Sequence, residues 1–407
     1  MMNAPTKPTI LFITSAHKGD AMIREVKDQG CHAILITEEK LKHEPFPYDS
    51  LDEVFYLPEL ARYKDVINMV SWLCRGRQID AIVPLDEFEV EIVAMLREHL
   101  RIPGMGVTNM RHFRDKLTMR ELTQAAGIRV PPFAQIKNYD TLREYMAAVL
   151  TPYMLKPRME AGSMGLEKIT DTEQLWRALD RLGDNQSHYL IEKFVPGDIY
   201  HADSVVWDGK VQFVTVAKYG APPFQVYHGG GVFMTRLIPN SSKEAKAIKT
   251  MNAKVIKTLN LPYGVTHGEY IQAEADGEFY FLEIAARVGG ANIADVVEAG
   301  TGLNPFREWG RIEVARLRGE EYELPTVRNQ YAGILMTLAR QEYPDLSNYT
   351  DPEIVWRANK EYHAGLIASS DSYERLESLM GQYLQRFGED FMTRADPWGT
   401  QRTGHAG

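Results

Sequence analysis

The sequence predicts a mixed fold class, α/β together with α+β, divided among several domains, and three observations lead to it. At 407 residues the chain is too long for one ordinary hydrophobic core, so two or three domains are expected. Near the N-terminus, short β-rich apolar runs alternate with helix-like segments, which is typical of a parallel α/β sheet. Beyond residue 112 strands and helices follow in mixed order, which indicates an α+β architecture.

The first domain, residues 1–112, is expected to contain the parallel sheet. Its predicted strands cover residues 9–14, 33–37 and 81–84, and its predicted helices cover 20–29, 63–75 and 89–99. The turn after the first strand lacks the Gly-x-Gly-x-x-Gly pattern of a dinucleotide site. We therefore expect this domain to be a scaffold or a wall of the substrate site.

A Pro- and Gly-rich stretch at residues 103–106 marks a domain boundary, and a helix over 113–126 follows it. The next predicted strands cover 152–156, 189–194, 203–207, 211–218 and 232–238, with helices over 172–182 and 243–259 between them. Beyond Pro325 we predict strands over 332–338, 353–357 and 366–369, a helix over 372–387, and a loose polar tail from Arg394.

Composition narrows the class of protein. No apolar run approaches the length of a membrane span, and the polar N-terminus does not look like a signal peptide, so no membrane insertion or export is expected. Only Cys31 and Cys74 are present, which fits a reducing cytoplasm. The net charge of −9, without a dense basic block, makes nucleic acid a poor partner.

Residues 266–290 carry the most informative pattern. Apolar alternation on both sides of Asp276-Gly277 predicts two adjacent strands joined by a tight turn. Glu269 and Glu283 would then project from one face, where two carboxylates suit Mg²⁺. Arg287, after the second strand, is placed to steady negative charge. A solvated hairpin with surface glutamates is the alternative.

A second pattern follows the strand predicted to end near Lys156. Gly162 and Gly165 allow backbone N–H groups to approach phosphate oxygens closely, and Ser163 adds a hydroxyl. Lys156 supplies a point charge at the same place. The pattern therefore indicates a phosphate-binding loop, with an ordinary surface turn as the alternative.

Two further segments are candidates for binding a nucleotide. Lys116 lies in the helix after the boundary, where a solvated lysine is the alternative. A strand that ends before Pro-Gly exposes backbone donors and acceptors beside apolar side chains, as adenine-binding segments do. Its residues are Glu192, Lys193, Phe194 and Val195. A strand terminated by Pro-Gly without a ligand is the other interpretation.

In this order, these elements resemble the ATP-grasp superfamily, specifically the carboxylate–amine ligases related to carbamoyl-phosphate synthetase, biotin carboxylase and bacterial L-amino acid (dipeptide) ligases. The resemblance covers most of the chain. It implies an N-terminal α/β domain over 1–112, a smaller grasp lobe with linker helices over 113–190, and a larger lobe over 191–319. A small mixed C-terminal segment and tail then cover 320–407.

The resemblance also implies roles in ATP binding. Lys116 and Lys156 match the two basic residues that hold the phosphates. Gly162, Ser163 and Gly165 match the flexible phosphate loop. The segment matching the one that holds adenine contains Glu192, Lys193, Phe194 and Val195.

Metal and catalytic roles follow from the hairpin. Glu269 and Glu283 match the magnesium ligands, with Glu283 bridging two ions, and Arg287 matches the arginine near the reacting carboxylate. His267 lies two residues before Glu269 and is a candidate for reaching the substrate, with a plain strand histidine as the alternative.

The chain departs from the family pattern at two positions. Ala285 replaces an asparagine that commonly supplies a magnesium oxygen, and Ile199 replaces an acidic ribose ligand. His201 or Asp203 is the candidate substitute for the ribose ligand.

The implied reaction uses ATP and Mg²⁺, or Mn²⁺ in its place, to convert a small-molecule carboxylate into an acyl phosphate that an amine then attacks. An amino acid or similar acid as acyl donor and a second amino acid as acceptor are the preferred substrates. Proteins of this kind are often dimers, so a homodimer is one candidate assembly, although the sequence does not specify the oligomeric state. The alternatives are another ATP-grasp ligase, of the purine-pathway or carboxylating type, and a non-catalytic ATP-binding regulatory module.

Overall fold

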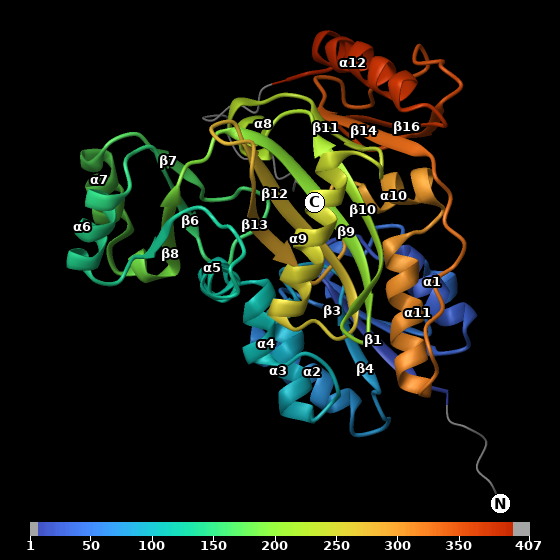
Figure 1. Cartoon of the computed structure of the whole chain (residues 1–407). Coiled ribbons are helices and arrows are strands. Elements are labelled where there is room, and N and C mark those ends of the chain that lie inside the picture. Colours follow the sequence, from blue (N-terminus) through green and yellow to red (C-terminus); the bar gives the residue numbers. More distant parts are fainter. Residues whose placement is uncertain (1–6, 394–407) are drawn as a thin grey trace, which may run out of the picture.

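Within residues 7–393, which the computed structural model describes, the strands form three sheets (Figure 1). The N-terminal sheet has the order β3-β2-β1-β4, and all its pairs are parallel. Its strands are β1 (Thr9–Thr14), β2 (His32–Glu38), β3 (Glu53–Leu57) and β4 (Ala81–Pro84). The predicted parallel α/β domain is confirmed. The sequence prediction omitted β3, an edge strand whose residues are all only partly buried.

Helices cover both faces of this sheet because successive side chains of a strand point in opposite directions. Ile10 and Phe12 of β1 share a core with α1 (Asp20–Asp28). Leu11 and Ile13 share the opposite core with α2 (Tyr63–Leu73) and α3 (Val90–Leu100). A helix from much later in the chain, α11 (Pro305–Arg318), packs beside α1. The N-terminal domain is therefore fixed to the remainder of the chain through a continuous apolar core.

The second sheet is small and antiparallel, in the order β5-β8-β6-β7. Its strands are β5 (Phe133–Gln135), β6 (Tyr153–Pro157), β7 (Glu167–Ile169) and β8 (Tyr189–Lys193). Its core is shared with α6 (Tyr139–Ala148) and α7 (Thr172–Leu182), which lie together at one side of Figure 1. The boundary expected between residues 190 and 191 falls inside β8, and the domain limits stay a prediction.

The third sheet has eight antiparallel strands in the order β13-β12-β9-β10-β11-β14-β16-β15. Its strands are β9 (Gly197–Trp207), β10 (Lys210–Tyr219), β11 (Phe233–Leu237), β12 (Gly264–Ala273), β13 (Phe279–Ala285), β14 (Tyr331–Leu338), β15 (Ile354–Arg357) and β16 (His363–Ser370). The long helix α9 (Lys243–Leu259) crosses one face of it (Figure 1). Because β14 pairs with β11, the C-terminal strands extend the same sheet.

The remaining helices are α4 (Val107–Met110), α5 (Lys116–Ala125), α8 (Pro223–Gly229), α10 (Ile293–Thr301) and α12 (Tyr373–Asp390). The sequence prediction omitted α10 and α11, although α11 has standard boundary signals: Asn304 caps it, Pro305 follows, and Gly319 ends it. Among the described residues no helix is both long and apolar enough to cross a membrane. The tail expected from Arg394 lies outside the described residues.

Candidate active site

The predicted hairpin is confirmed as β12 and β13, with Asp276 and Gly277 in the turn between them. Gly277 has φ 72°, and Asp276 Oδ1 accepts a hydrogen bond from the backbone N–H of Glu278. Glu269 lies directly opposite Glu283 in this register. Side chains opposite each other in an antiparallel pair share one face of the sheet, so the two carboxylates lie side by side as expected.

Two side chains, one on β10 and one on β12, contact the carboxylate of Glu269. The Tyr219 hydroxyl on β10 donates a 2.9 Å hydrogen bond to Glu269 Oε1, and His267 Nε2 lies 3.7 Å from the same oxygen. Burial raises the pKa of Glu269, but these two contacts outweigh it and lower the pKa below its ordinary value. Glu269 is therefore an ionised carboxylate with a fixed orientation. Tyr219 was not among the residues predicted from sequence.

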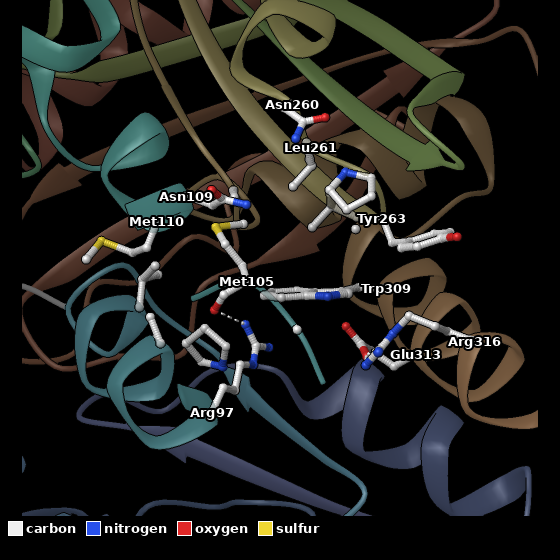
Figure 2. A pocket seen from close by; sticks show the side chains of 18 residues that line it. Arg97, Met105, Asn109, Met110, Asn260, Leu261, Tyr263, Trp309, Glu313 and Arg316 are labelled. Atoms are coloured by element: carbon white, nitrogen blue, oxygen red, sulfur yellow. Dashed lines mark hydrogen bonds and ion pairs between the residues drawn. The ribbon is translucent and has the colours of Figure 1, made fainter. Parts of the chain in front are cut away.

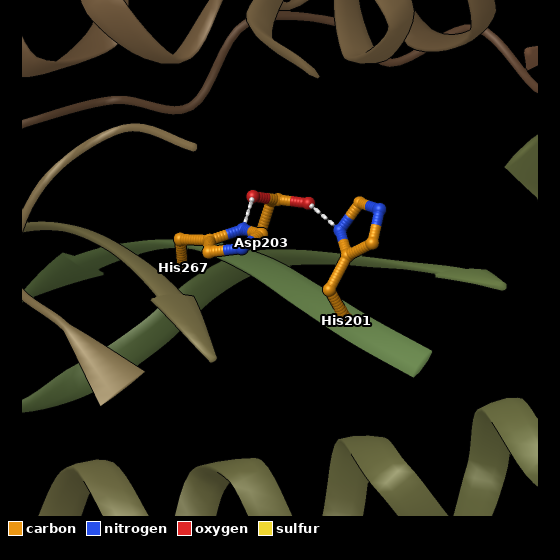
Figure 3. Close-up of side chains that lie close together, drawn as sticks. All are labelled: His201, Asp203 and His267. Carbon is orange, nitrogen blue, oxygen red and sulfur yellow. Dashed lines mark hydrogen bonds and ion pairs between the residues drawn. The ribbon is translucent and has the colours of Figure 1, made fainter. Parts of the chain in front are cut away.

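Behind Glu269 lies a buried polar network, shown in Figure 3. Asp203 Oδ2 is 2.7 Å from His201 Nδ1, and Asp203 Oδ1 is 2.9 Å from His267 Nδ1. His201 Nε2 is 2.7 Å from the Thr235 hydroxyl. His201 and Asp203 are 0% and 3% exposed, so the geometry gives no support to a ribose-binding role for either of them.

The same network is the one group of three His, Cys, Asp or Glu residues within 7–393 whose ligand atoms lie close enough together for a metal ion. Both imidazoles already bond Asp203 through Nδ1, so an ion would have to replace these contacts. Burial lowers the pKa of His267, but Asp203 and Glu269 outweigh it and raise the pKa to about 9. A protonated His267 between the two carboxylates offsets one of their two negative charges.

Lys116, on the helix that precedes the small sheet, contacts the hairpin. It is in the first turn of α5, and its Nζ lies 3.0 Å from Glu283 Oε2. The same Nζ donates a 2.6 Å hydrogen bond to the carbonyl of Glu160, which precedes the predicted phosphate loop. Lys116 therefore links the two features that the sequence assigned to phosphate and metal binding.

Arg287 faces the N-terminal domain. Its Nε donates a 3.0 Å hydrogen bond to Glu87 Oε2, and Arg114 Nη1 lies 2.6 Å from Glu87 Oε1. Burial raises the pKa of Glu87, but Arg287, Arg114 and Lys116 outweigh it and lower the pKa to about 2. The charge of Glu87 in turn raises the pKa of Arg287, against burial. Sequence reasoning missed Glu87 and Arg114, which have no local signal.

Lys156 and Glu192 meet in the small sheet rather than at the hairpin. Lys156 Nζ forms an ion pair with Glu192 Oε1, while Arg120 donates 2.9 and 2.8 Å hydrogen bonds to Oε2. Arg120 is fully buried and also donates to the carbonyl of Leu282 in β13. The unpredicted Arg120 thus connects the small sheet to the second strand of the hairpin.

The segment expected to hold adenine already uses part of its backbone. Lys193 N–H donates to the Pro132 carbonyl at 2.7 Å, and Phe194 N–H donates to the Pro152 carbonyl at 3.0 Å. Lys193 Nζ points away to the Leu150 carbonyl, 2.7 Å distant. Of the four residues in this segment, Val195 is the one whose backbone N–H donates no hydrogen bond to another backbone group within residues 7–393.

The predicted phosphate loop has the backbone that its glycines suggest. Gly162, Ser163 and Gly165 all have positive φ, at 63°, 62° and 67°. A Cβ on Gly165 would lie only 2.8 Å from Pro157 Cγ, so glycine is required there on two grounds. The loop follows β6 and is partly or fully exposed, and its N-terminal end is tied down by Lys116.

Comparison with known proteins agrees with this arrangement. The ATP-grasp domain family matches residues 121–291, which include the small sheet and the hairpin. Residues 121–291 are an ATP-grasp domain. The predicted resemblance is confirmed. Arg114 and Lys116 lie just before the matched region, and Glu87 lies further back, in the N-terminal domain.

Relatives of this chain include ligases. An L-arginine-specific L-amino acid ligase of Bacillus subtilis is 22% identical over 272 residues, 65% of either chain. An alanine–anticapsin ligase of Bacillus subtilis strain 168 is 25% identical over 59% of this chain and 55% of its own. The matches thus span 65% and 55% of these two relatives' lengths, less than two thirds of either.

Solved structures share the fold. An L-amino acid ligase from Bacillus licheniformis superimposes with a TM-score of 0.77 at 17% identity, over 97% of this chain and all of its own. A phosphoribosylglycinamide synthetase from Anaerococcus prevotii gives 0.68 at 16% identity, over 96% of this chain and all of its own. The N-terminal α/β domain, the ATP-grasp lobes and the C-terminal strands therefore form one known architecture.

Proposed function

We propose that the chain is an ATP-dependent ligase that joins a carboxylate to an amine through an acyl phosphate, releasing ADP and phosphate. The observation that carries this proposal is the pairing of Glu269 with Glu283, with Lys116 on Glu283, inside an ATP-grasp domain. The relatives that are carboxylate–amine ligases support the reaction class.

The donor set fits Mg²⁺. Glu269 and Glu283 offer hard oxygen ligands from opposed positions, and Mg²⁺ typically binds one or two carboxylates with phosphate oxygens and water. When bound there, the ion would neutralise charge on the phosphates of ATP. Ala285 contributes no oxygen beside this pair, so fewer protein ligands are expected than in members with asparagine.

The chain's own residues would supply positioning and charge. Lys116 and Lys156 would neutralise phosphate oxygens, since phosphoryl transfer is catalysed mainly by positioning and electrostatics. Arg287 keeps its positive charge because Glu87 raises its pKa, and it would stabilise the oxyanion formed when the amine attacks. The loop containing Gly162 and Gly165 would exclude water from the acyl phosphate.

An amino acid, or a similar acid, is the proposed acyl donor and a second amino acid the acceptor, which would make the product a dipeptide. The test is phosphate release from ATP and Mg²⁺ across single amino acids and their pairs, with mass spectrometry of every positive reaction. A product with the mass of both acids minus water supports the proposal. Phosphate release without such a product contradicts it.

A second candidate is an ATP-grasp ligase of the purine-pathway or carboxylating type. It is favoured by structural similarity to a phosphoribosylglycinamide synthetase and to an N5-carboxyaminoimidazole synthetase from Staphylococcus aureus, the latter with a TM-score of 0.70. Turnover that requires bicarbonate or a ribose-phosphate amine would select it. ATP binding without turnover on any of these substrates would instead select a regulatory module.

A further inference from the structure

A cavity of about 270 Å³ lies outside the candidate active site, between the N-terminal domain and the large sheet (Figure 2). Its walls come from α3 and α4 on one side, from the chain leading into β12 on another, and from α11 on the third. None of the residues that line it was assigned to ATP, metal or catalysis. Its volume is near the lower limit for small-molecule sites, so it suits a metabolite rather than a large cofactor.

Most of the cavity wall is apolar or aromatic. The indole of Trp309 lies along the floor, with Met105 above it and Tyr263 beside it (Figure 2). Ala94 and Met110, which are almost completely buried, close the side toward the N-terminal domain. Such a surface favours a ligand with an aromatic or branched apolar body.

One charged group in the cavity wall, Arg97, is held by carbonyl groups and not by a carboxylate. Arg97 donates hydrogen bonds to the carbonyls of Ile82, at 3.1 and 2.6 Å, and of Met105, at 3.4 Å. These three contacts leave part of its donor capacity unused, and it forms no ion pair among residues 7–393. Gly104 leaves room for it, because a Cβ there would lie 2.7 Å from Arg97 Nε.

The other two charges of the cavity neutralise each other. Arg316 Nη2 lies 2.6 Å from Glu313 Oε2, one turn earlier on α11. The cavity therefore carries one net positive charge, on Arg97. Burial lowers the pKa of Arg97 to about 10, with Glu313 opposing the shift and Arg316 adding to it. Arg97 is partly buried, and its guanidinium is still charged at neutral pH. A charge that is partly removed from water is stabilised by an opposite charge beside it.

We propose that this cavity is a second binding site, for a small monocarboxylic acid with an aromatic or branched apolar body. The carboxylate pairs with Arg97, and the apolar body lies against Trp309 and Met105. This site goes beyond the proposed ligase reaction and does not depend on it. Its wall includes Pro84 and Ala286, which precede Glu87 and Arg287, so a bound acid lies directly behind the ion pair that joins the N-terminal domain to the hairpin.

The test measures binding rather than turnover. Isothermal titration calorimetry of the full chain without ATP uses 3-phenylpropionate as the anionic probe and 3-phenylpropylamine as its cationic counterpart. We expect saturable 1:1 binding of the acid, with a dissociation constant of about 1 mM or tighter. The amine, which has a similar shape and the opposite charge, is expected not to bind.

Two variants and one matched control locate the site. Asn109→Phe fills the mouth of the cavity from an exposed position, and Thr108→Phe places the same ring on the adjacent exposed residue, which does not line the cavity. Arg97→Met removes the charge. We expect Asn109→Phe and Arg97→Met to weaken binding of the acid about tenfold or more, the size of a lost charge-assisted contact, and Thr108→Phe to leave it unchanged.

Asn109→Phe changes an exposed residue and keeps the hydrogen bonds of Arg97 to the carbonyls of Ile82 and Met105. A loss of binding in this variant therefore reports on the cavity and not on misfolding. Absence of binding by the wild-type chain overturns the proposal. Equal binding of acid and amine, or undiminished binding by Asn109→Phe, overturns it as well. Since ATP is absent throughout, these results are independent of whether the chain is a dipeptide ligase.

Discussion

Glu192 in the small sheet and Glu283 on the hairpin are both strand glutamates next to a lysine, but their surroundings differ. Glu192 is 1% exposed, and each of its oxygens has a cation, Lys156 on one and Arg120 on the other. The side chain of Glu283 is 36% exposed, and its one ion-pair partner among the described residues is Lys116. Both carboxylate oxygens of Glu192 are therefore paired with cations of the protein itself, whereas Glu283 retains one oxygen for an external cation.

This contrast predicts that the two sites fail in different ways. The largest effect is expected for Arg120→Met, which leaves Glu192 buried with half of its countercharge. Breaking a buried ion pair from one side costs about 3–5 kcal/mol of unfolding free energy, to be measured by urea denaturation. Arg143→Met, which removes an exposed arginine paired with Asp140 on α6, is the matched control and should change almost nothing. Equal stability of the two variants would contradict a structural role for Arg120.

Glu283→Gln should give the opposite result, a large loss of turnover with little loss of stability. We expect phosphate release to fall by about a hundredfold or more, the usual cost of removing one electrostatic contact to the transition state. Because Glu283 is partly exposed, the unfolding free energy should change by about 0.5 kcal/mol or less. Glu278→Gln, in the turn of the same hairpin, is the control and should keep full activity.

Arg287→Ala is a less clean test of the same site. Arg287 is paired with the buried Glu87. Its removal should therefore lower stability as well as turnover, so Arg287→Lys is the better variant.

Tyr219→Phe removes only the hydroxyl that orients Glu269. Partners that orient a metal ligand typically contribute about 10- to 100-fold in metal affinity. We therefore expect the variant to need a higher Mg²⁺ concentration than the wild type for half-maximal ATP binding. Titration of Mg²⁺ against ATP binding, with the wild-type maximum recovered at high Mg²⁺, would show this. Tyr280→Phe, which loses a hydrogen bond to Asp276 in the turn, is the control. An unchanged Mg²⁺ dependence in Tyr219→Phe would contradict the proposal that Glu269 is a metal ligand oriented by Tyr219.

Glu89 extends the comparison to a buried glutamate that forms no ion pair within residues 7–393. It is 2% exposed; its Oε1 accepts a bond from Ser15 N–H, and its Oε2 has no hydrogen-bond partner. Burial raises its pKa to about 7, and Asp86 adds to the rise, while the Ser15 bond and the charge of Lys18 oppose it. The native state then keeps a proton that the unfolded chain loses near pH 4.5, so stability should fall as pH rises from 4.5 to 7.

Glu89→Gln should remove this slope. The variant should match the wild type near pH 4.5 and exceed it by about 3 kcal/mol at pH 8, because its amide carries no buried charge. Denaturant unfolding at the two pH values measures the difference. A wild-type chain that is the more stable of the two at pH 8 would show that Glu89 has a cationic partner when ionised.

Local patterns predicted much of the site because their cause is local. Asp276-Gly277 determines the hairpin turn, and alternation then places Glu269 opposite Glu283. The partners of these residues could not be predicted, because they come from distant parts of the chain. Arg120 is 72 residues from Glu192, Tyr219 is 50 from Glu269, and Glu87 is 200 from Arg287. Tertiary packing alone brings such pairs together.

The continuity of the large sheet limits how the chain can be shortened. A protein cut after residue 319 would lose β14, which pairs with β11 through four residue positions on each strand. The backbone N–H and C=O groups of β11 would then form an open edge, ready to pair with the same edge of another molecule. Such a fragment would keep every predicted ATP and metal ligand, yet it would tend to self-associate. The C-terminal strands thus act as the protein's own protection against aggregation.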